Sequence, residues 1–333
     1  MNFKHVKSPC CGAKIRHFGG RRRQCDNCNK TWSIRPKKRG RPQHRLATDR
    51  LGKVFLNNFS VKQLFSGRVE VKLAGYYYRF RQHLLKLVAK PYTPQIPEGP
   101  LILLADGIWF KFDGKPWVLY LTALKPCSGK HAVFLRPYLI QGKEGGAKWQ
   151  RIFSQIPEDI KRRTCALVVD NFNGMQAYAK ENNWLIQLCH FHLLAKLKVR
   201  RDIKQRTLKG GAGRIEIHEL ISYALHAEDP QRLNEVLTRL EFFSKGDVVT
   251  KRIRATVRDF LSCSSCYRTF LNYPNLNLPN TTNTMESMNS LLKALLRHSR
   301  AGTTPKSLLM WSEALIRSKK QLACRDQKST EFP

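Results

Sequence analysis

The stretch LILLADGIWFKFDGKPWVLYLTAL, residues 101–124, carries the pattern that decides the fold. It contains two apolar runs separated by Asp113-Gly114, and an Asp-Gly pair between two such runs is a strong signal for a β-hairpin. A third apolar segment, HAVFLRPYLI at 131–140, predicts another strand. We therefore expect three antiparallel strands at the start of this region.

The segments that follow alternate between strand and helix patterns. A helix is expected around 147–156, and CALVVD, 165–170, predicts a short buried strand. MQAYAKENN, 175–183, predicts a helix, and WLIQLCHF, 184–191, predicts a further strand. Three antiparallel strands followed by strand–helix–strand units suggest a mixed sheet with helices, so the expected fold class is α/β.

Residues 193–275 lose this alternation. In IHELISYALHAEDPQRLNEVLTRLEFFSKG, 217–246, the apolar residues recur at helical spacing, which predicts an all-helical insertion. The last part, 276–325, is expected to contain a helix near TTNTMESMNSLLKALLRH, 281–298, and further C-terminal helices.

The first 35 residues are cysteine-rich and basic, and they predict a small zinc ribbon. A C-x2-C knuckle supplies two ligands for a tetrahedral Zn²⁺ from one tight turn. The expected ligands are Cys10, Cys11, Cys25 and Cys28. The first knuckle is irregular, because Ser8 stands where its first cysteine would be. Reduced thiols without metal are the alternative, and a nearby histidine could complete the ligand set: His5 or His17.

A series of basic segments follows the ribbon. PKKRGRPQHR, 36–45, predicts a linker whose RGRP, 39–42, resembles an AT-hook core for the A·T minor groove. Residues 46–90 predict a helical, helix-turn-helix-like DNA-binding region with its recognition helix near 72–81. The prolines of 91–100 predict a second linker. A solvated linker and a plain helical domain are the alternatives. The candidate DNA contacts are Arg21, Arg22, Arg23, Arg39, Arg41, Arg79 and Arg81.

The composition favours a polyanionic partner. The chain has 333 residues, with 60 Lys and Arg against 24 Asp and Glu, which gives a formal net charge of +36 at pH 7. Such a surplus repels itself in the compact state, and DNA compensates it because lysine and arginine displace counterions from phosphates. No apolar window reaches the length of a membrane span, and the N-terminus lacks a signal-peptide pattern. We therefore expect no membrane insertion, no secretion and a cytoplasmic location.

Three acidic side chains occupy unusual settings. Asp106 is embedded in a strand, Asp170 ends the CALVV strand, and Glu286 lies on the polar side of the last long helix pattern. A buried carboxylate is costly without a cation or hydrogen-bond donors. The alternatives are a strand-end hydrogen bond, a helix N-cap and an exposed helix residue. Asn283 and Asn289 lie three residues before and after Glu286, so their amides can hold its carboxylate.

Three carboxylates from two strands and a helix can hold two hard divalent cations, Mg²⁺ or Mn²⁺, about 4 Å apart. One ion can activate water or a 3′-hydroxyl, and the other can stabilise the leaving oxygen. This is phosphodiester chemistry. Three other acidic residues are less attractive ligands, since they lie in an apparent turn, a Gly-rich loop and a helix start: Asp113, Glu144 and Asp159.

The order and spacing of these motifs resemble the Mutator-like superfamily of DDE transposases, with its bacterial insertion-sequence members. DGIW resembles the family's first-aspartate strand, while VVDNFNG and the later CHFH resemble its second-aspartate segment and C-x2-H motif. TNTMESMNSLLK resembles the Asn-x2-Glu-x2-Asn helix, and the N-terminal ribbon looks like those that precede such catalytic domains. The resemblance covers roughly 100–320 well and 1–90 loosely.

The resemblance implies an RNase H-like catalytic domain, whose first part spans 101–192 and whose glutamate helix follows the all-helical insertion at 193–275. It implies that Asp106, Asp170 and Glu286 form the catalytic, metal-binding triad.

The C-x2-H pair, Cys189 and His192, is implied to support the active-site fold. The Cys263-x2-Cys266 pair of the insertion could join Cys189 and His192 in a metal site, and buried thiols are the alternative interpretation.

By this resemblance, the chain is a transposase that binds terminal inverted repeats, cleaves DNA at the element ends and joins 3′-OH ends to target DNA. Synapsis of two ends implies a homo-oligomer, and the DNA partner implies association with the bacterial nucleoid. Two alternatives stay open. One is a catalytically inactive zinc-ribbon regulator that binds DNA, and the other is an RNase H-like nuclease without strand transfer.

Overall fold

The structure, a computed structural model, forms two compact units, Met1–Ala47 and Thr48–Pro333. The residues that it describes are 7–19, 22–33, 73–198, 211–299 and 302–324. Several expectations lie outside these residues: the basic linker 36–45, residues 46–72 of the helix-turn-helix-like region, His5, Arg21, Arg39 and Arg41.

The first unit is a small antiparallel sheet in the order β1-β2-β3. Its strands are β1 (Ile15–His17), β2 (Arg22–Cys25) and β3 (Thr31–Ser33). The turn from β2 to β3 holds the C-x2-C motif, where the Asn29 N–H donates to the Cys25 carbonyl over 3.0 Å. Among the described residues of this unit, Cys25 is the single buried apolar side chain. A hydrophobic core therefore contributes little to the stability of this unit.

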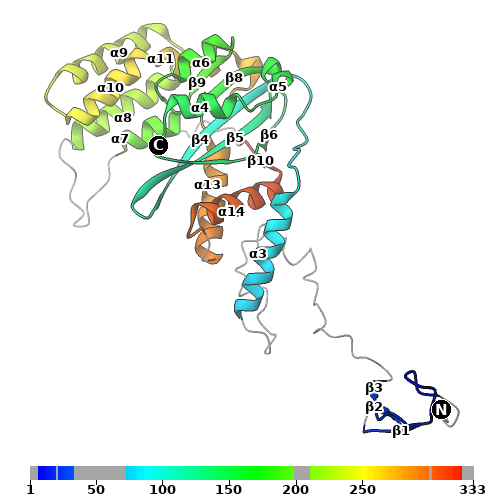
Figure 1. The fold of residues 1–333 in the computed structure, drawn as a ribbon. Coiled ribbons are helices and arrows are strands. Elements are labelled where there is room, and N and C mark those ends of the chain that lie inside the picture. Colours follow the sequence, from blue (N-terminus) through cyan, green and yellow to red (C-terminus); the bar gives the residue numbers. More distant parts are fainter. Residues whose placement is uncertain (1–6, 20–21, 34–72, 199–210, 300–301, 325–333) are drawn as a thin grey trace. The chain divides into compact units, whose positions relative to one another are not determined.

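The second unit is organised around the predicted hairpin, which the structure confirms (Figure 1). Strands β4 (Leu101–Phe112) and β5 (Lys115–Pro126) pair antiparallel along their whole length. Both turn residues have positive φ, 48° at Asp113 and 76° at Gly114, as a two-residue hairpin turn requires. The long strands therefore follow from a turn that the sequence specifies locally.

The expectation of one continuous third strand over 131–140 is wrong. The structure divides it into β6 (His131–Phe134) and β7 (Tyr138–Gln141), and both pair antiparallel with β5. Pro137 lies in the interruption, and a proline has no backbone N–H to donate to a neighbouring strand.

The strands on the other side of β4 are parallel to it. Strand β8 (Thr164–Val169) pairs with β4, and β9 (Leu185–Leu188) pairs with β8. Three helices lie between these strands in the chain: α4 (Gly146–Phe153), α5 (Glu158–Arg163) and α6 (Met175–Glu181). The strand order is β10-β6-β5-β4-β8-β9, where β10 is Gln321–Ala323 and β7 pairs with β5 beside this path, so the class is a mixed α/β sheet. The predicted strand 184–191 ends early, because Cys189 caps helix α7 (His190–Leu197).

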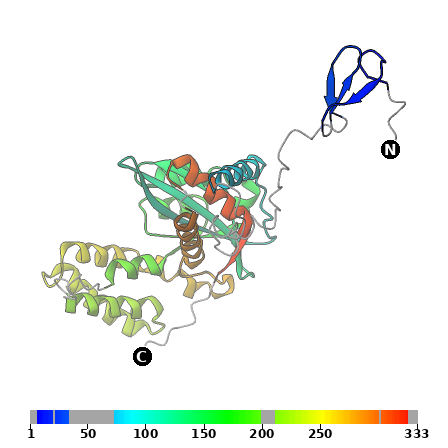
Figure 2. The same cartoon turned by 90° about the horizontal axis from the view of Figure 1, so that it is seen from below.

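Both faces of the central strands are covered, which explains their continuous apolar sequence. On one face Tyr120 packs edge-on against Trp149 of α4, with ring centroids 4.7 Å apart. Helix α13 (Asn283–Ser299) contacts β4 and β5, and Figure 2 shows it crossing these strands. Helix α14 (Pro305–Lys319) packs on α3 (Leu73–Ala89).

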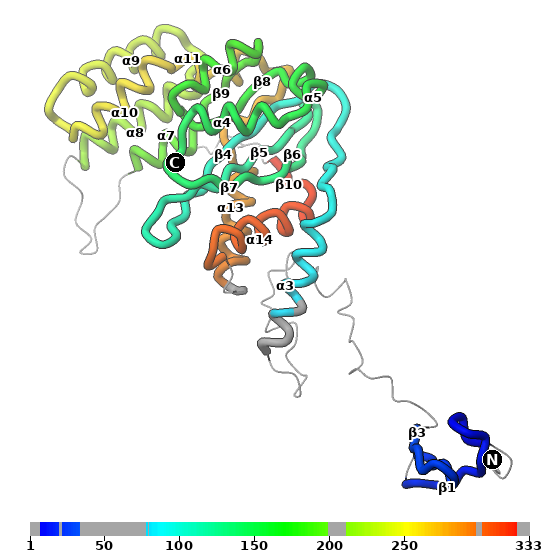
Figure 3. Tube along the Cα trace, in the orientation of Figure 1, coloured from blue at the N-terminus to red at the C-terminus, as the bar shows by residue number. Residues whose placement is uncertain are grey.

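The described part of 193–275 is helical, as predicted, and Figure 3 traces its adjacent helices. Its elements are α8 (Gly211–His226), α9 (Pro230–Lys245), α10 (Lys251–Ser262), α11 (Ser264–Tyr267), α12 (Thr269–Asn272) and the 3₁₀ turn η1 (Pro274–Leu276). The short helices α11 and α12 contact β9, and so bring the chain back to the sheet before α13.

Strand β10 (Gln321–Ala323) was not expected; it pairs antiparallel with β6 and forms an edge of the sheet. Within the described residues, every helix is too short or too polar to cross a lipid bilayer.

Candidate functional site

Two of the predicted carboxylates lie on neighbouring parallel strands. Asp106 belongs to β4 and is 9 % exposed, and its Oδ1 accepts a hydrogen bond from the Gly107 N–H at 2.9 Å. Asp170 directly follows β8, and its Oδ1 accepts from the Asn171 N–H at 2.7 Å. Lys196 Nζ lies 3.3 Å from the same Asp170 oxygen. Backbone donors thus fix one oxygen of each carboxylate.

The third carboxylate, Glu286, comes from the first turn of α13, the helix that contacts β4. Burial raises the pKa of Asp106 to about 8, and the charges of Glu144, Glu286 and Asp170 contribute to this shift. Burial also raises the pKa of Glu286 to about 7. The charges of Glu286 and Asp170 thus reach Asp106, although the three residues are far apart in the sequence, and we call them the acidic pocket. Within the described residues their ligand atoms do not form a group within 4.8 Å of one another, so the structure does not itself place all three around one shared ion.

A fourth acidic residue, Glu144, belongs to the same pocket. Its Oε1 accepts a hydrogen bond from Trp149 Nε1 at 3.0 Å. A Cβ atom built on Gly107 would lie 2.4 Å from this Oε1, so only a glycine leaves room for the carboxylate beside Asp106. Burial raises the pKa of Glu144 to about 7, and the charge of Asp170 adds to the effect.

Sequence reasoning ranked Glu144 below the other carboxylates because it lies between glycines. The nearby signal was Trp149, five residues later, whose indole N–H needs an acceptor when the ring is buried. The buried indole does not show which residue is its acceptor, because only the tertiary fold brings the loop with Glu144 against β4.

The C-x2-H pair lies at the start of α7, next to the carboxylates. Cys189 is fully buried, and its Sγ accepts a hydrogen bond from the Thr282 N–H at 3.3 Å. Burial raises the pKa of this thiol to about 11. His192 Nε2 lies 3.7 Å from Asp106 Oδ1, and burial lowers the pKa of His192.

Within the described residues, two groups of side chains are close enough to share a metal ion. One joins Cys189, His192 and Glu286, whose ligand atoms all lie within 4.8 Å of one another. The alternative site that adds Cys263 and Cys266 is not among them. Cys263 instead donates its S–H to a carbonyl of its own helix, at Asp259.

The two flanking asparagines begin and continue the helix of Glu286. Asn283 is its first residue, and Asn289 lies one turn beyond Glu286. Among the residues that the structure describes, the buried atoms Glu286 Oε1 and Asn289 Oδ1 have no hydrogen-bond partner. The amide of Asn289 therefore does not hold Glu286 Oε1.

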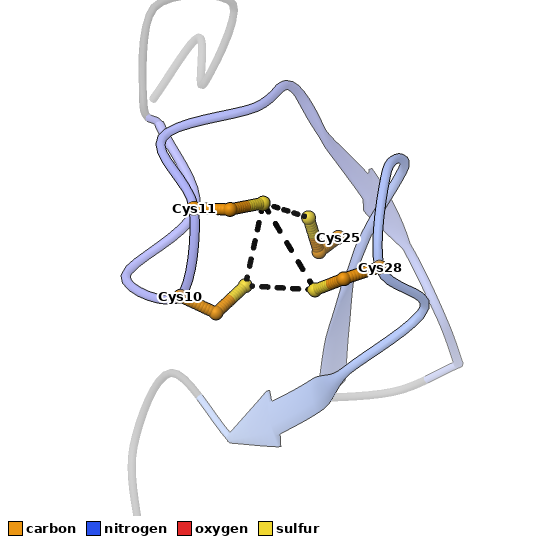
Figure 4. Close-up of side chains that lie close together, drawn as sticks. All are labelled: Cys10, Cys11, Cys25 and Cys28. Carbon is orange, nitrogen blue, oxygen red and sulfur yellow. Dashed lines mark hydrogen bonds between the residues drawn. The ribbon is translucent and has the colours of Figure 1, made fainter.

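The second group is the four-cysteine cluster of the first unit, shown in Figure 4. Its sulfur–sulfur distances are 3.2 Å for Cys10–Cys28, 3.3 Å for Cys11–Cys25, 3.9 Å for Cys11–Cys28 and 4.0 Å for Cys10–Cys11. Four sulfurs around one Zn²⁺ at about 2.3 Å lie roughly 3.8 Å apart. The four thiols therefore lie close together and could bind a structural metal such as zinc.

Hydrogen bonds to Cys25 favour a thiolate in this cluster. The Cys28 N–H and the Ser8 hydroxyl lower the pKa of Cys25 to about 6. Ser8 thus contacts the cluster without being one of its ligands. His17, on β1, is exposed and does not belong to the cluster.

The candidate DNA-contacting arginines that the structure describes lie on two different elements, strand β2 and helix α3. Arg22 and Arg23 lie on β2, where Arg22 is exposed. Arg81 is exposed on α3, the described part of the predicted DNA-binding region. Arg79 belongs to the same helix, and its side chain lies outside the described structure.

No family model and no curated protein matches this chain.

Proposed function

We propose that the chain is a DDE transposase that cleaves DNA at the ends of a mobile element and joins the 3′-OH ends to target DNA. The observation that carries the proposal is that Asp106, buried on β4, has Asp170 and Glu286 near enough for their charges to raise its pKa. Neighbouring parallel strands supply the two aspartates, and a helix against the sheet supplies the glutamate.

The sheet supports an RNase H-like catalytic domain. Its antiparallel strands β6, β5 and β4 come first in the chain and are followed by the parallel strands β8 and β9. The helices α8 to α10 then intervene before the glutamate helix, as the expected all-helical insertion requires.

The donor set fits hard divalent cations. Buried carboxylates with raised pKa values lack enough compensating positive charge, and oxygen ligands of this kind suit Mg²⁺ or Mn²⁺. Asp106, Asp170 and Glu286 would hold two such ions, with Glu144 close to them. When bound, the ions supply an activated water or 3′-hydroxyl and neutralise the leaving oxygen.

The chain's own residues orient this chemistry. The N–H groups of Gly107 and Asn171 each hold one aspartate oxygen in place. Lys196 and His192 stand beside the two aspartates, where they can face the phosphate of a bound strand. Fixed carboxylates and a fixed cation reduce the reorganisation that the reaction needs.

The remaining features support recognition of DNA. The net charge of +36 suits a phosphate backbone. Each of the two candidate DNA-binding segments, the cysteine-rich sheet and α3, carries an exposed arginine, Arg22 and Arg81 respectively. The four-cysteine sheet is then a zinc ribbon that contacts the terminal inverted repeats. Synapsis of two ends makes the working form a homo-oligomer.

A nicking assay tests the proposal. The full chain is incubated with Mg²⁺ and a duplex that carries an inverted repeat from the DNA flanking its coding region. Wild type is expected to nick at the repeat end, and Asp170→Asn is expected to lose this activity. Asp113→Asn is the matched control, since Asp113 is an exposed turn residue outside the pocket.

Two results would contradict the proposal. Equal activity in wild type and Asp170→Asn, or none in either, would count against catalysis by these carboxylates, and a lack of activity in both would favour the inactive regulator. Nicking without joined products in a strand-transfer assay would favour the nuclease.

A further inference from the structure

The start of α7 and the first turn of α13 bring together three different metal-ligating side chains. Cys189 offers a sulfur, His192 a ring nitrogen and Glu286 a carboxylate oxygen, all within 4.8 Å of one another. From these residues we propose a zinc site that is distinct from the four-cysteine cluster and that shares Glu286 with the acidic pocket. The proposal does not depend on transposase activity.

Unpartnered polar atoms provide a second, independent observation. In the described part of the chain, the buried atoms His192 Nδ1, Glu286 Oε1 and Asn289 Oδ1 have no hydrogen-bond partner. A buried polar atom without a partner is unfavourable, because it has lost its hydrogen bonds to water. Two of these atoms belong to residues of the group itself, and the third lies one helical turn beyond Glu286. A bound cation would give partners to the two atoms of the group.

The ligand chemistry selects zinc over magnesium. A thiolate and an imidazole are poor ligands for Mg²⁺ and good ligands for Zn²⁺, which also accepts a carboxylate. Three protein ligands leave a fourth position for water or for the nearby amide oxygen of Asn289. Binding replaces the S–H proton of Cys189 with a Zn–S bond, and the proton leaves to solvent.

The backbone prepares this arrangement before any metal binds. The His190 N–H donates to the Asn280 carbonyl at 2.9 Å, and the Thr282 N–H donates to Cys189 Sγ. The Glu286 N–H in turn donates to the Thr282 carbonyl at 3.0 Å. The N–H donor to sulfur and the two helix N-termini act against the cost of burying the negative ligands.

A zinc ion here has a positioning role. It ties Glu286 to His192, whose Nε2 lies 3.7 Å from Asp106 Oδ1. Since Glu286 has two carboxylate oxygens, one can bind zinc while the other faces the aspartates. The ion would therefore fix the glutamate helix against the strand of the first aspartate.

The test is the zinc content of the purified full chain, measured by elemental analysis after expression with zinc and removal of loosely bound metal. Wild type is expected to hold two zinc ions per chain, one in the four-cysteine cluster. Cys28→Ser and Cys189→Ser should each lower the content by one, and the double variant should hold none. Cys266→Ser is the matched control, because Cys266 belongs to neither group.

A second variant guards against misfolding. His192→Ala should also lose one zinc ion, while circular dichroism and the melting profile report whether the fold survives. With Co²⁺ in a Cys28→Ser background, a thiolate-to-metal absorption band should appear and should vanish on adding Cys189→Ser. Zinc content unchanged by both Cys189→Ser and His192→Ala would overturn the proposal. Normal zinc content in a chain that does not nick DNA would instead count against the proposed function.

Discussion

The four-cysteine cluster and the carboxylate pocket gather ligands in opposite ways. The cysteines come from 10–28, and the small sheet around them buries little apolar surface. The carboxylates come from two strands, a loop and a distant helix, and they are supported by a large core that includes Tyr120 and Trp149. The first cluster could be held together by a structural metal such as zinc, whereas the fold holds the second at a cost that a metal would relieve.

This difference separates two roles for metal. In the first unit a bound metal would supply folding free energy, because thiolates and metal would take the place of a core. In the second unit the fold forces like charges together, and the ions would offset their repulsion and desolvation. Four experiments test this contrast.

Metal removal should have its largest effect on the first unit, because the second unit has a large hydrophobic core that does not depend on the zinc proposed there. Binding of structural zinc contributes about 10–16 kcal/mol to the folding of small domains, and a sheet this small cannot stay folded after such a loss. We expect a strong chelator, or Cys28→Ser, to unfold β1–β3 while the second unit keeps its structure. Amide resonances and limited proteolysis of the full chain report both units. A first unit that stays folded without metal would contradict the contrast.

The acidity of the pocket should make the metal-free second unit less stable as the pH rises. The pKa of Asp106 is raised to about 8, and those of Glu144 and Glu286 to about 7. The native state thus retains protons that the unfolded state has lost, so the free energy of unfolding falls between about pH 4 and pH 8. The slope is up to about 1.4 kcal/mol per pH unit for each retained proton.

Denaturant unfolding at several pH values in this window measures the slope. Asp106→Asn should flatten it, and Mg²⁺ should restore stability at the alkaline end. A stability that rises with pH in wild type relative to Asp106→Asn would sink this prediction.

Displacing Glu144 should reduce activity without unfolding the chain. Gly107→Ala places a Cβ against the Glu144 carboxylate, which is the movable end of a side chain. We expect a loss of nicking of about tenfold, or roughly 1.4 kcal/mol. Glu144→Gln should lose a similar amount, and the double variant little more, because both changes act on one carboxylate.

The control for this pair is Gly145→Ala, since a Cβ there meets nothing within 4 Å and the backbone is extended. A full additive loss in the double variant would show that the two positions act separately.

The smallest effect is expected from Lys196, which is 42 % exposed and 3.3 Å from Asp170. Lys196→Gln removes a positive charge that competes with Mg²⁺ for Asp170. At such an exposed site the ion pair with Asp170 contributes less than about 1 kcal/mol. The Mg²⁺ concentration for half-maximal nicking should therefore fall by a few-fold, while the maximal rate falls if Lys196 also contacts phosphate. An increased Mg²⁺ requirement would contradict this interpretation.

Local signals predicted much of the fold. The Asp113-Gly114 turn fixed the hairpin, and the C-x2-C spacing located two of the four clustered cysteines, because both signals act over a few residues. The prediction for 131–140 was wrong because it ignored Pro137, although the sequence shows it. The boundary at Cys189 was missed since the apolar run LIQLCHF continues from a strand into a helix.

Long-range features were harder to predict. No local sequence pattern predicts the contact between Glu144 and Gly107, because it joins a loop to the middle of a strand. The pairing of β10 with β6 is similar, since a three-residue strand has too few residues for a periodic pattern. The convergence of the carboxylates was expected from their positions in strands and a helix and from motif order, but how near they lie to one another depends on the whole sheet.

The late position of β10 in the chain has a consequence for synthesis on the ribosome. Strand β6 is made early, yet the strand that covers its outer edge, β10, emerges only after α14. During translation that edge offers unpaired N–H and C=O groups to any other nascent chain. The yield of native protein should therefore depend on chaperone supply and on how fast the final segment leaves the exit tunnel.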